Sequence, residues 1–109
     1  MGYYTNYEIS VTDPQGNSWT EEFLDEARKD NNYFQHLYRN DACLHAKWYD
    51  HELDIVEASK NLKFKDYLIK LTGEGEEPGD LWIKYFKNGK VQVCKAEIVY
   101  PPFDESKLK

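Results

Sequence analysis

The chain has 109 residues, of which 16% are aromatic and 31% are charged, and its net charge at pH 7 is −6. This length fits one domain spanning residues 1–109, and the aromatic content excludes a disordered polar tail. The acidic balance argues against general binding to phosphate backbones, which requires clustered Lys and Arg, and the apolar runs are far shorter than the ~20 residues that span a bilayer.

The first predicted element is a strand over residues 3–12, whose side chains alternate between two faces. Tyr7, Ile9 and Val11 share one face and polar residues lie between them, which is typical of a half-buried strand. The next segment, Asp-Pro-Gln-Gly-Asn at 13–17, contains residues that turns prefer. We therefore expect the chain to reverse direction there.

A helix is predicted over residues 18–29. Ser18 and Glu21 have the spacing of a capping box, in which each side chain satisfies a free amide of the first turn. The pattern weakens after this segment and resumes over 33–40, so we expect one helix with a break, or two short helices. The expected apolar stripe of the first part consists of Trp19, Phe23, Leu24 and Ala27.

The middle of the chain predicts a short strand and a second helix. The strand is expected over residues 42–49, where apolar and polar residues alternate loosely. Asp50 is placed to cap a helix over 51–62, with Leu53, Val56 and Leu62 as its expected inward residues.

Three strands are predicted in the last part of the chain, over residues 64–73, 81–86 and 91–100. Asn88-Gly89 between the last two is the sequence signature of a two-residue hairpin turn. Strands at both ends of the chain with helices between them predict an α+β fold. In this fold a mostly antiparallel sheet carries two helices packed on one face.

The segment 71–82 contains four acids, three glycines, one proline and no base. Its glycines do not match a phosphate-binding loop, and its acids do not match an EF-hand. Three interpretations remain open: a solvated connection, an acidic surface for a partner, and a weak site for a divalent ion. The candidate partner-binding acids are Glu74, Glu76, Glu77 and Asp80 here, with Glu22, Asp25 and Glu26 on the first helix.

A candidate metal site is formed by Cys43, His45 and His51, in the pattern C-x-H-x5-H. Thiolate and imidazole groups are ligands of zinc, and the first two residues would share one face of a strand over 42–49. The spacing is not that of a zinc finger. The alternative is a buried thiol beside histidines that bind no metal, so zinc stays a hypothesis for this segment.

The predicted hairpin carries four lysines beside Trp82 and Tyr85: Lys84, Lys87, Lys90 and Lys95. Lys84 and Lys90 are expected on one face across the turn. Lysines with aromatic neighbours can bind single-stranded nucleic acid. Lysines also face solvent on edge strands, where they oppose pairing with other chains, and this second interpretation is favoured.

Sequence motifs of enzymes are missing from the chain. It contains no GxSxG, HExxH, P-loop or CxxC pattern. Two cysteines do not make a disulfide framework, and no basic and apolar leader is visible, so we expect reduced thiols in a cytoplasm. The sequence therefore favours a protein that acts by binding and not by catalysis.

Three segments resemble a set of small proteins carried by phages and other mobile elements. They are GYYTNYEISV, KWYDHE and GEGEEPGDLWIKYFKNGKVQ, and together they cover about a third of the chain. The resemblance implies a ferredoxin-like fold and, by analogy, an inhibitor of host defence of the anti-CRISPR kind. The implied partner is a basic nucleic-acid-handling protein of the host cytoplasm, such as a CRISPR effector nuclease.

The leading hypothesis is therefore a non-enzymatic inhibitor that docks its acidic residues on a basic host protein. A zinc-stabilised binding module and a single-stranded nucleic-acid binder that uses the lysine hairpin are the alternatives. Neither a membrane nor direct contact with nucleic acid is expected for the leading hypothesis.

Overall fold

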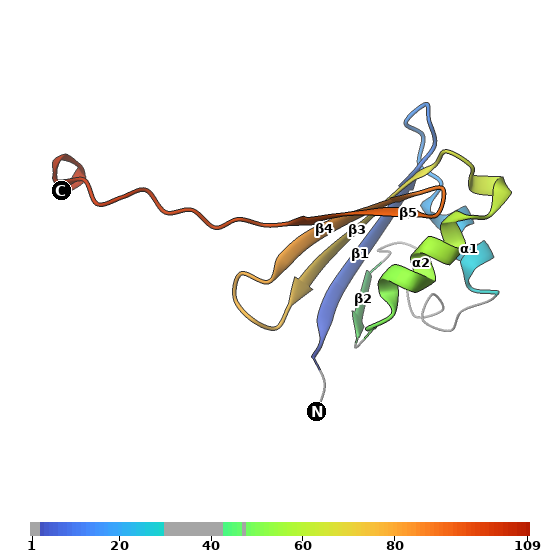
Figure 1. Cartoon of the computed structure of the whole chain (residues 1–109), viewed down its shortest axis with the longest axis horizontal. Helices are drawn as coiled ribbons and strands as arrows, with labels where there is room; N and C mark the ends of the chain where they lie inside the picture. Colours follow the sequence, from blue (N-terminus) through green and yellow to red (C-terminus); the bar gives the residue numbers. More distant parts are fainter. Residues whose placement is uncertain (1–2, 30–42, 47) are drawn as a thin grey trace.

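The computed structural model describes residues 3–29, 43–46 and 48–109, with residues 43–46 described by their backbone. One five-stranded sheet has the order β2-β1-β3-β4-β5, and every neighbouring pair of strands is antiparallel. Helices α1 and α2 lie on one side of it (Figure 1). The elements are β1 (Thr5–Thr12), α1 (Thr20–Ala27), β2 (Cys43–Ala46), α2 (His51–Ser59), β3 (Leu68–Gly75), β4 (Leu81–Lys87) and β5 (Lys90–Lys95), with short 3-10 turns at Leu62–Phe64 and Glu105–Lys107.

The predicted α+β class is confirmed, as is the antiparallel sheet with helices on one face. The described elements follow the order β-α-β-α-β-β-β. Ferredoxin-like proteins have the order β-α-β-β-α-β. The chain therefore shares their two layers but connects them differently, with its last three strands consecutive.

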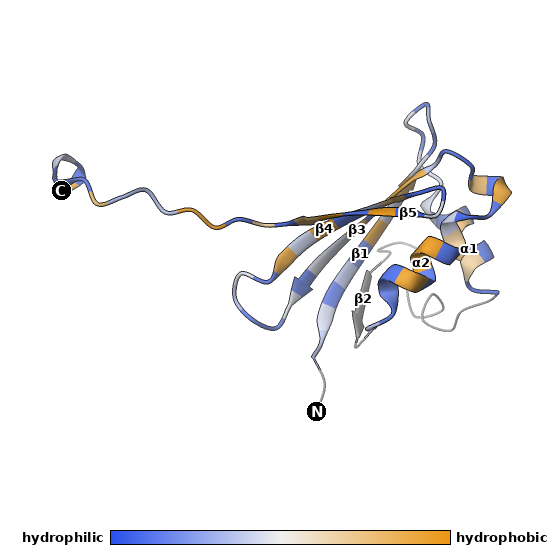
Figure 2. Cartoon of the chain, in the orientation of Figure 1, coloured by the Kyte–Doolittle hydropathy of each residue, from blue (hydrophilic) through white to orange (hydrophobic). Residues whose placement is uncertain are grey.

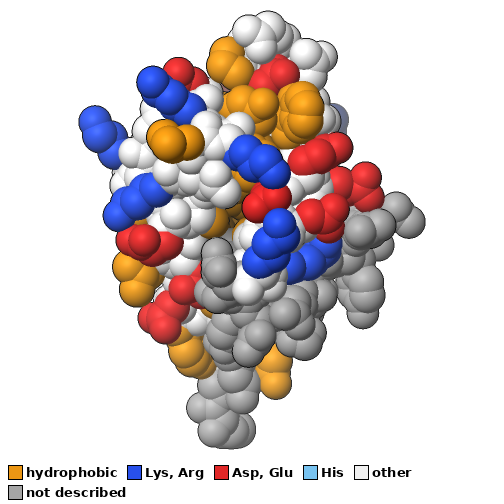
Figure 3. Space-filling view, turned by 90° about the vertical axis from the view of Figure 1, so that its right-hand side faces the viewer, with side chains coloured by type: hydrophobic (Ala, Val, Ile, Leu, Met, Phe, Trp, Pro, Cys, Tyr) orange, Lys and Arg blue, Asp and Glu red, His pale blue; other side chains and the backbone are white. Residues whose placement is uncertain are grey.

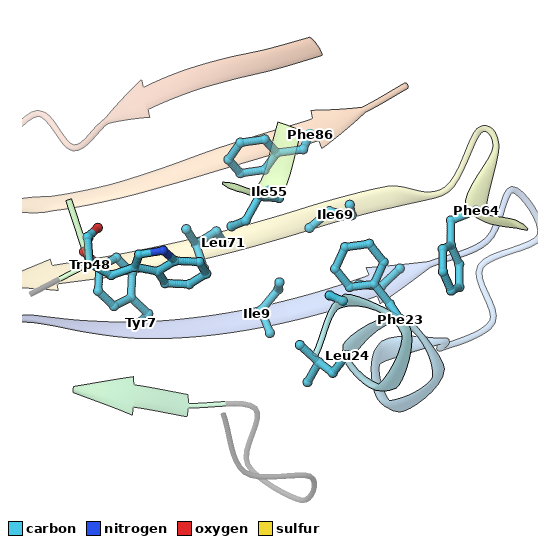
Figure 4. Close-up of a cluster of buried hydrophobic side chains, with 12 residues drawn as sticks. Tyr7, Ile9, Phe23, Leu24, Trp48, Ile55, Phe64, Ile69, Leu71 and Phe86 are labelled. Carbon is cyan, nitrogen blue, oxygen red and sulfur yellow. The ribbon is translucent and has the colours of Figure 1, made fainter. Parts of the chain in front are cut away.

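The core lies between the sheet and the helices (Figure 4). The alternation predicted for the first strand is confirmed, because every second residue of β1 is buried. Burial of each large apolar side chain contributes roughly 1.5–3 kcal/mol, so this layer is the main source of stability. Its largest fully buried side chains are Trp48, Phe23, Phe86, Leu24, Ile55, Ile69, Leu71 and Val11.

Two details of the predicted helices are wrong, and the helical stretch predicted over residues 33–40 lies outside the described residues. Helix α1 begins at Thr20 and Ser18 does not cap it; instead the Thr20 hydroxyl accepts a hydrogen bond from the Val11 amide at 3.0 Å. In α2 Ile55 is fully buried and Val56 packs against the core, whereas the expected inward residues Leu53 and Leu62 are 61% and 85% exposed. Apolar residues occur on more than one side of α2, so packing against the sheet selects the inward face.

The hairpin turn is confirmed at Asn88 and Gly89, whose φ angles are 51° and 79°. The Asn88 side chain exchanges two hydrogen bonds of 2.8 Å with Asp66, and the Gly89 amide donates to the Ser59 hydroxyl at 2.8 Å. The turn is therefore attached both to the start of β3 and to the end of α2. Within the described ranges, no helix is long and apolar enough to cross a membrane.

The last strand ends earlier than its sequence predicts. Strand β5 stops at Lys95, because its neighbour β4 begins at Leu81 and offers no partner beyond it. The last backbone hydrogen bond joins the Ala96 amide to the Leu81 carbonyl at 2.9 Å. The chain then continues away from the sheet (Figure 1).

Candidate functional site

The acidic loop joins β3 to β4 and has an ordered backbone. The Gly75 amide donates to the Asp80 carbonyl at 2.8 Å, and the Asp80 amide donates to the Glu77 carbonyl at 3.1 Å. Gly79 has a φ of 85°, a conformation that glycine adopts without strain. These bonds hold the acidic loop, Glu74–Asp80, as a compact turn at the end of the sheet.

Tyr3 fixes this loop to the first strand. Its hydroxyl donates to the Asp80 carboxylate and accepts from the Glu77 amide at 3.1 Å. The hydrogen bond to the Asp80 carboxylate raises the pKa of Tyr3, because ionisation of the phenol would remove the donor. A side chain at Gly75 would overlap both groups, so glycine is needed where they meet.

Among the residues that the structure describes, no base is paired with a carboxylate of the loop. The Glu76 side chain accepts a hydrogen bond from the Tyr4 amide at 3.1 Å. Within the described part of the chain, no ion pair involves any of the loop's acids. An ordered group of like charges creates a local negative potential that attracts basic partners. The acids of this group are Glu74, Glu76, Glu77 and Asp80.

The predicted acids of helix α1 have a different environment. Asp25 pairs with Arg28 at 2.9 Å, and Glu26 pairs with Lys63 at 2.7 Å and with Lys29 at 3.2 Å. The hydrogen bond from Lys63 is the main reason why the pKa of Glu26 lies below its usual value. Acids and bases are therefore interspersed at the helix end of the molecule (Figure 3).

A hollow of about 300 Å³ lies beside these helical acids. Two of its aromatic side chains, Trp19 and Tyr67, have ring centroids 6.0 Å apart. The Lys63 ammonium, paired with Glu26, lies at the rim of the hollow. The hollow is lined by Trp19, Glu22, Asp25, Glu26, Lys63, Phe64 and Tyr67.

The two acidic groups lie at opposite ends of β1. Thr5 pairs with Gly75 beside the acidic loop, and Val11 is bonded to Thr20 at the start of α1. Six residues of strand separate these points, or roughly 20 Å at ~3.3 Å per residue. The structure therefore divides the predicted acidic residues into a loop group and a helix group.

The predicted zinc ligands are only partly placed by the structure. Cys43 and His45 lie on β2, in register with Glu8 and Asn6, and their side chains are outside the described residues. His51 is described, and both of its ring nitrogens already have partners. No cluster of three His, Cys, Asp or Glu residues that could hold a metal occurs among the residues with described side chains. Zinc at these positions stays a prediction.

A charged cluster around the buried side chain of Lys84 was missed by the sequence interpretation. The Lys84 side chain is only 11% exposed, and its Nζ lies 2.7 Å from His51 Nε2 and 2.8 Å from Glu52 Oε2. The same Nζ is 4.5 Å from the centroid of the Trp82 ring. The Trp82 ring stacks on His51 and crosses Gly73, where a side chain would overlap the indole.

The hydrogen bonds of this cluster define its protonation. The Trp48 carbonyl can only accept, so His51 Nδ1, at 2.8 Å, carries a proton. Nε2 then accepts from the Lys84 ammonium, which can only donate, and His51 is neutral. Burial and the adjacent Lys84 charge both lower the pKa of His51, and the hydrogen bond from Lys84 lowers the pKa of Glu52.

The chemistry of the cluster is that of a satisfied structural link between α2 and β4. Strand alternation could have found it, because Lys84 lies between the inward residues Trp82 and Phe86. The expected grouping of Lys84 with Lys90 on one face is wrong. Lys90 pairs in register with Lys87 and therefore lies on the opposite face of the hairpin.

No protein-family model matches the chain, and comparisons with curated proteins and with solved structures found no match.

Proposed function

We propose that this protein is a binding protein that docks the acidic loop on a basic surface of another protein. The observation that carries the proposal is the group of four carboxylates on an ordered loop, none paired with a base in the described part of the chain. Unpaired charges on a fixed backbone cost little reorganisation when a complementary surface arrives, and they steer its approach.

The partner class that fits best is a nucleic-acid-handling protein of the host. Such proteins present Lys and Arg to the phosphate backbone, and an acidic loop can occupy the same electropositive groove. The resemblance of three segments to small phage-borne proteins supports a role in inhibiting host defence, in the manner of anti-CRISPR proteins, within the host cytoplasm.

The alternative of a single-stranded nucleic-acid binder has less support. Lys84 is committed to His51 and Glu52, so it is not available to a phosphate. Lys87 and Lys90 remain exposed and border a hollow of about 410 Å³ that also includes Tyr85. Binding of a single-stranded oligonucleotide that is lost after Lys87→Glu and Lys90→Glu would support this alternative.

The proposal is tested with two matched variants. The loop variant carries Glu74→Gln, Glu76→Gln and Glu77→Gln, and keeps Asp80 because its carboxylate holds Tyr3. The helix variant, with Glu21→Gln, Glu22→Gln and Asp25→Asn, changes the net charge equally at the other end of the sheet. The wild-type protein and each variant are immobilised and exposed to host lysate, with and without nuclease treatment.

The proposal expects the wild-type protein and the helix variant to capture the same basic protein, and the loop variant to lose it. Capture that survives in the loop variant and disappears in the helix variant would assign the contact to α1. Capture that depends on intact nucleic acid would favour the nucleic-acid alternative.

A further inference from the structure

Strand β5 forms one edge of the sheet and continues into an exposed apolar segment. Residues 96–100 extend onward from β5, away from the other strands (Figure 1). Hydrophobic residues recur along this segment (Figure 2). Val99 and Tyr100 are 81% and 83% exposed. Exposed apolar residues on an unpaired strand edge are a site where another chain can add.

The last hydrogen bond between β5 and β4 shows which backbone groups of this edge point away from the sheet. The Ala96 amide points toward β4, where it meets the Leu81 carbonyl. Because bonding direction alternates along a strand, the amides and carbonyls of Val93, Lys95, Glu97 and Val99 point to the open side. Among the described residues, no hydrogen bond involves the backbone of residues 97–100.

The sequence of this edge is complementary to itself. Residues 93–99 read Val-Cys-Lys-Ala-Glu-Ile-Val, with Ala96 at the centre. When the segment is laid antiparallel on a copy of itself about Ala96, valine meets valine, cysteine meets isoleucine and lysine meets glutamate. We propose that the chain forms a symmetric dimer through this pairing, which joins the two sheets into one.

Charge selects this register over its neighbours. With the two-fold axis at Ala96, Lys95 of each copy lies directly opposite Glu97 of the other copy. The outward-bonding residues pair with each other in this register, as an antiparallel ladder requires. Moving the axis by one residue places Lys95 opposite Lys95, or Glu97 opposite Glu97, and directly opposed like charges are unfavourable.

The ends of the paired segment are also defined. Pro101 and Pro102 follow Tyr100, and proline has no amide to donate to a ladder. At the other end, the hairpin turn limits β5 at Lys90. The charge of Lys95 opposes pairing of this edge with unrelated strands. In a second copy of the chain, Glu97 lies opposite Lys95 and neutralises its charge, so pairing with that copy is not opposed.

The test measures the oligomeric state of the full chain by sedimentation equilibrium over micromolar concentrations. The wild-type protein is expected to be a dimer. Lys95→Glu alone, or Glu97→Lys alone, replaces both attractive pairs with like charges and should raise the dimer dissociation constant about 10- to 100-fold. The exchange of both residues together should restore dimerisation, because the opposite charges still meet.

A cross-link locates the axis independently. In a background without cysteine, Cys43→Ser with Cys94→Ser, Ala96→Cys should give a disulfide-linked dimer under mild oxidation, because Ala96 faces itself at a non-hydrogen-bonded pair ~4.5 Å apart. The same background without Ala96→Cys is the control. A wild-type monomer, a dimer that the double exchange fails to restore, or no cross-link above the control would overturn the proposal.

Discussion

The Tyr3 hydroxyl donates a hydrogen bond to the Asp80 carboxylate across 77 positions of sequence. This bond joins the start of the first strand to the end of the acidic loop. The pairing of Thr5 with Gly75 brings the two segments together, and the missing side chain of Gly75 makes room for the bond. The conformation of the loop therefore depends on the pairing of the start of β1 with the end of β3.

Removal of the Tyr3 hydroxyl should loosen the loop without unfolding the domain. In Tyr3→Phe the Glu77 amide loses its acceptor and Asp80 loses its donor. Hydrogen exchange at the Glu77 amide should become faster, while amides of β1 and β3 stay protected. Tyr100→Phe is the matched control, because Tyr100 is 83% exposed at the other end of the chain. Unchanged exchange at Glu77 would contradict the anchoring role.

Substitution of the hairpin glycine should destabilise the fold. Gly89 has a φ of 79°, and a β-branched residue resists this region. Gly89→Val should therefore lower the free energy of unfolding by more than the ~1 kcal/mol that is ordinary for loss of a glycine. Gly89→Asn, which tolerates positive φ better, should cost less. The denaturant midpoints of the two variants give the comparison, and equal midpoints would argue against a conformational cause.

Stability should fall in mild acid because His51 is held as a neutral, half-buried ring. Its pKa in the folded protein is below the usual histidine value of 6.5, chiefly because the ring is partly buried. As the pH falls through 6.5, the unfolded chain takes up the proton first, so the free energy of unfolding decreases down to the folded pKa. The denaturant midpoint should be lower at pH 5.5 than at pH 7.5.

The variant His51→Gln isolates this titration. Its amide oxygen can still accept from Lys84, but the side chain does not ionise in this range. The difference between the midpoints at pH 7.5 and pH 5.5 should therefore shrink in the variant. A difference of the same size in both proteins would show that other groups cause the acid sensitivity.

Local patterns predicted those parts of the fold that local chemistry determines. The alternation of β1 follows from the two-residue period of apolar side chains along the strand. The turn at Asn88-Gly89 follows from the backbone angles that these two residues prefer. The inward face of α2 could not be predicted, because Leu53 and Ile55 compete for it and the sheet decides between them. The end of β5 likewise depends on where its neighbouring strand begins.

The candidate site was predicted in its residues but not in its arrangement. The acids of the loop were visible in the sequence, whereas their separation from the α1 acids depends on the direction of β1. The anchoring by Tyr3 also depends on strand register, which no short motif encodes. The burial of Lys84 was available from alternation, but a charged residue is ordinarily assigned to solvent.

The most direct test of the proposed function is the association rate of the captured partner, measured at several salt concentrations with the wild-type protein, the loop variant and the helix variant. Electrostatic steering acts mainly on association and is screened within about 8 Å at physiological ionic strength. We expect the loop variant to associate more slowly and to show a weaker salt dependence, while the helix variant matches the wild type. A loop variant with unaltered rate and unaltered salt dependence would contradict a docking role for the acidic loop.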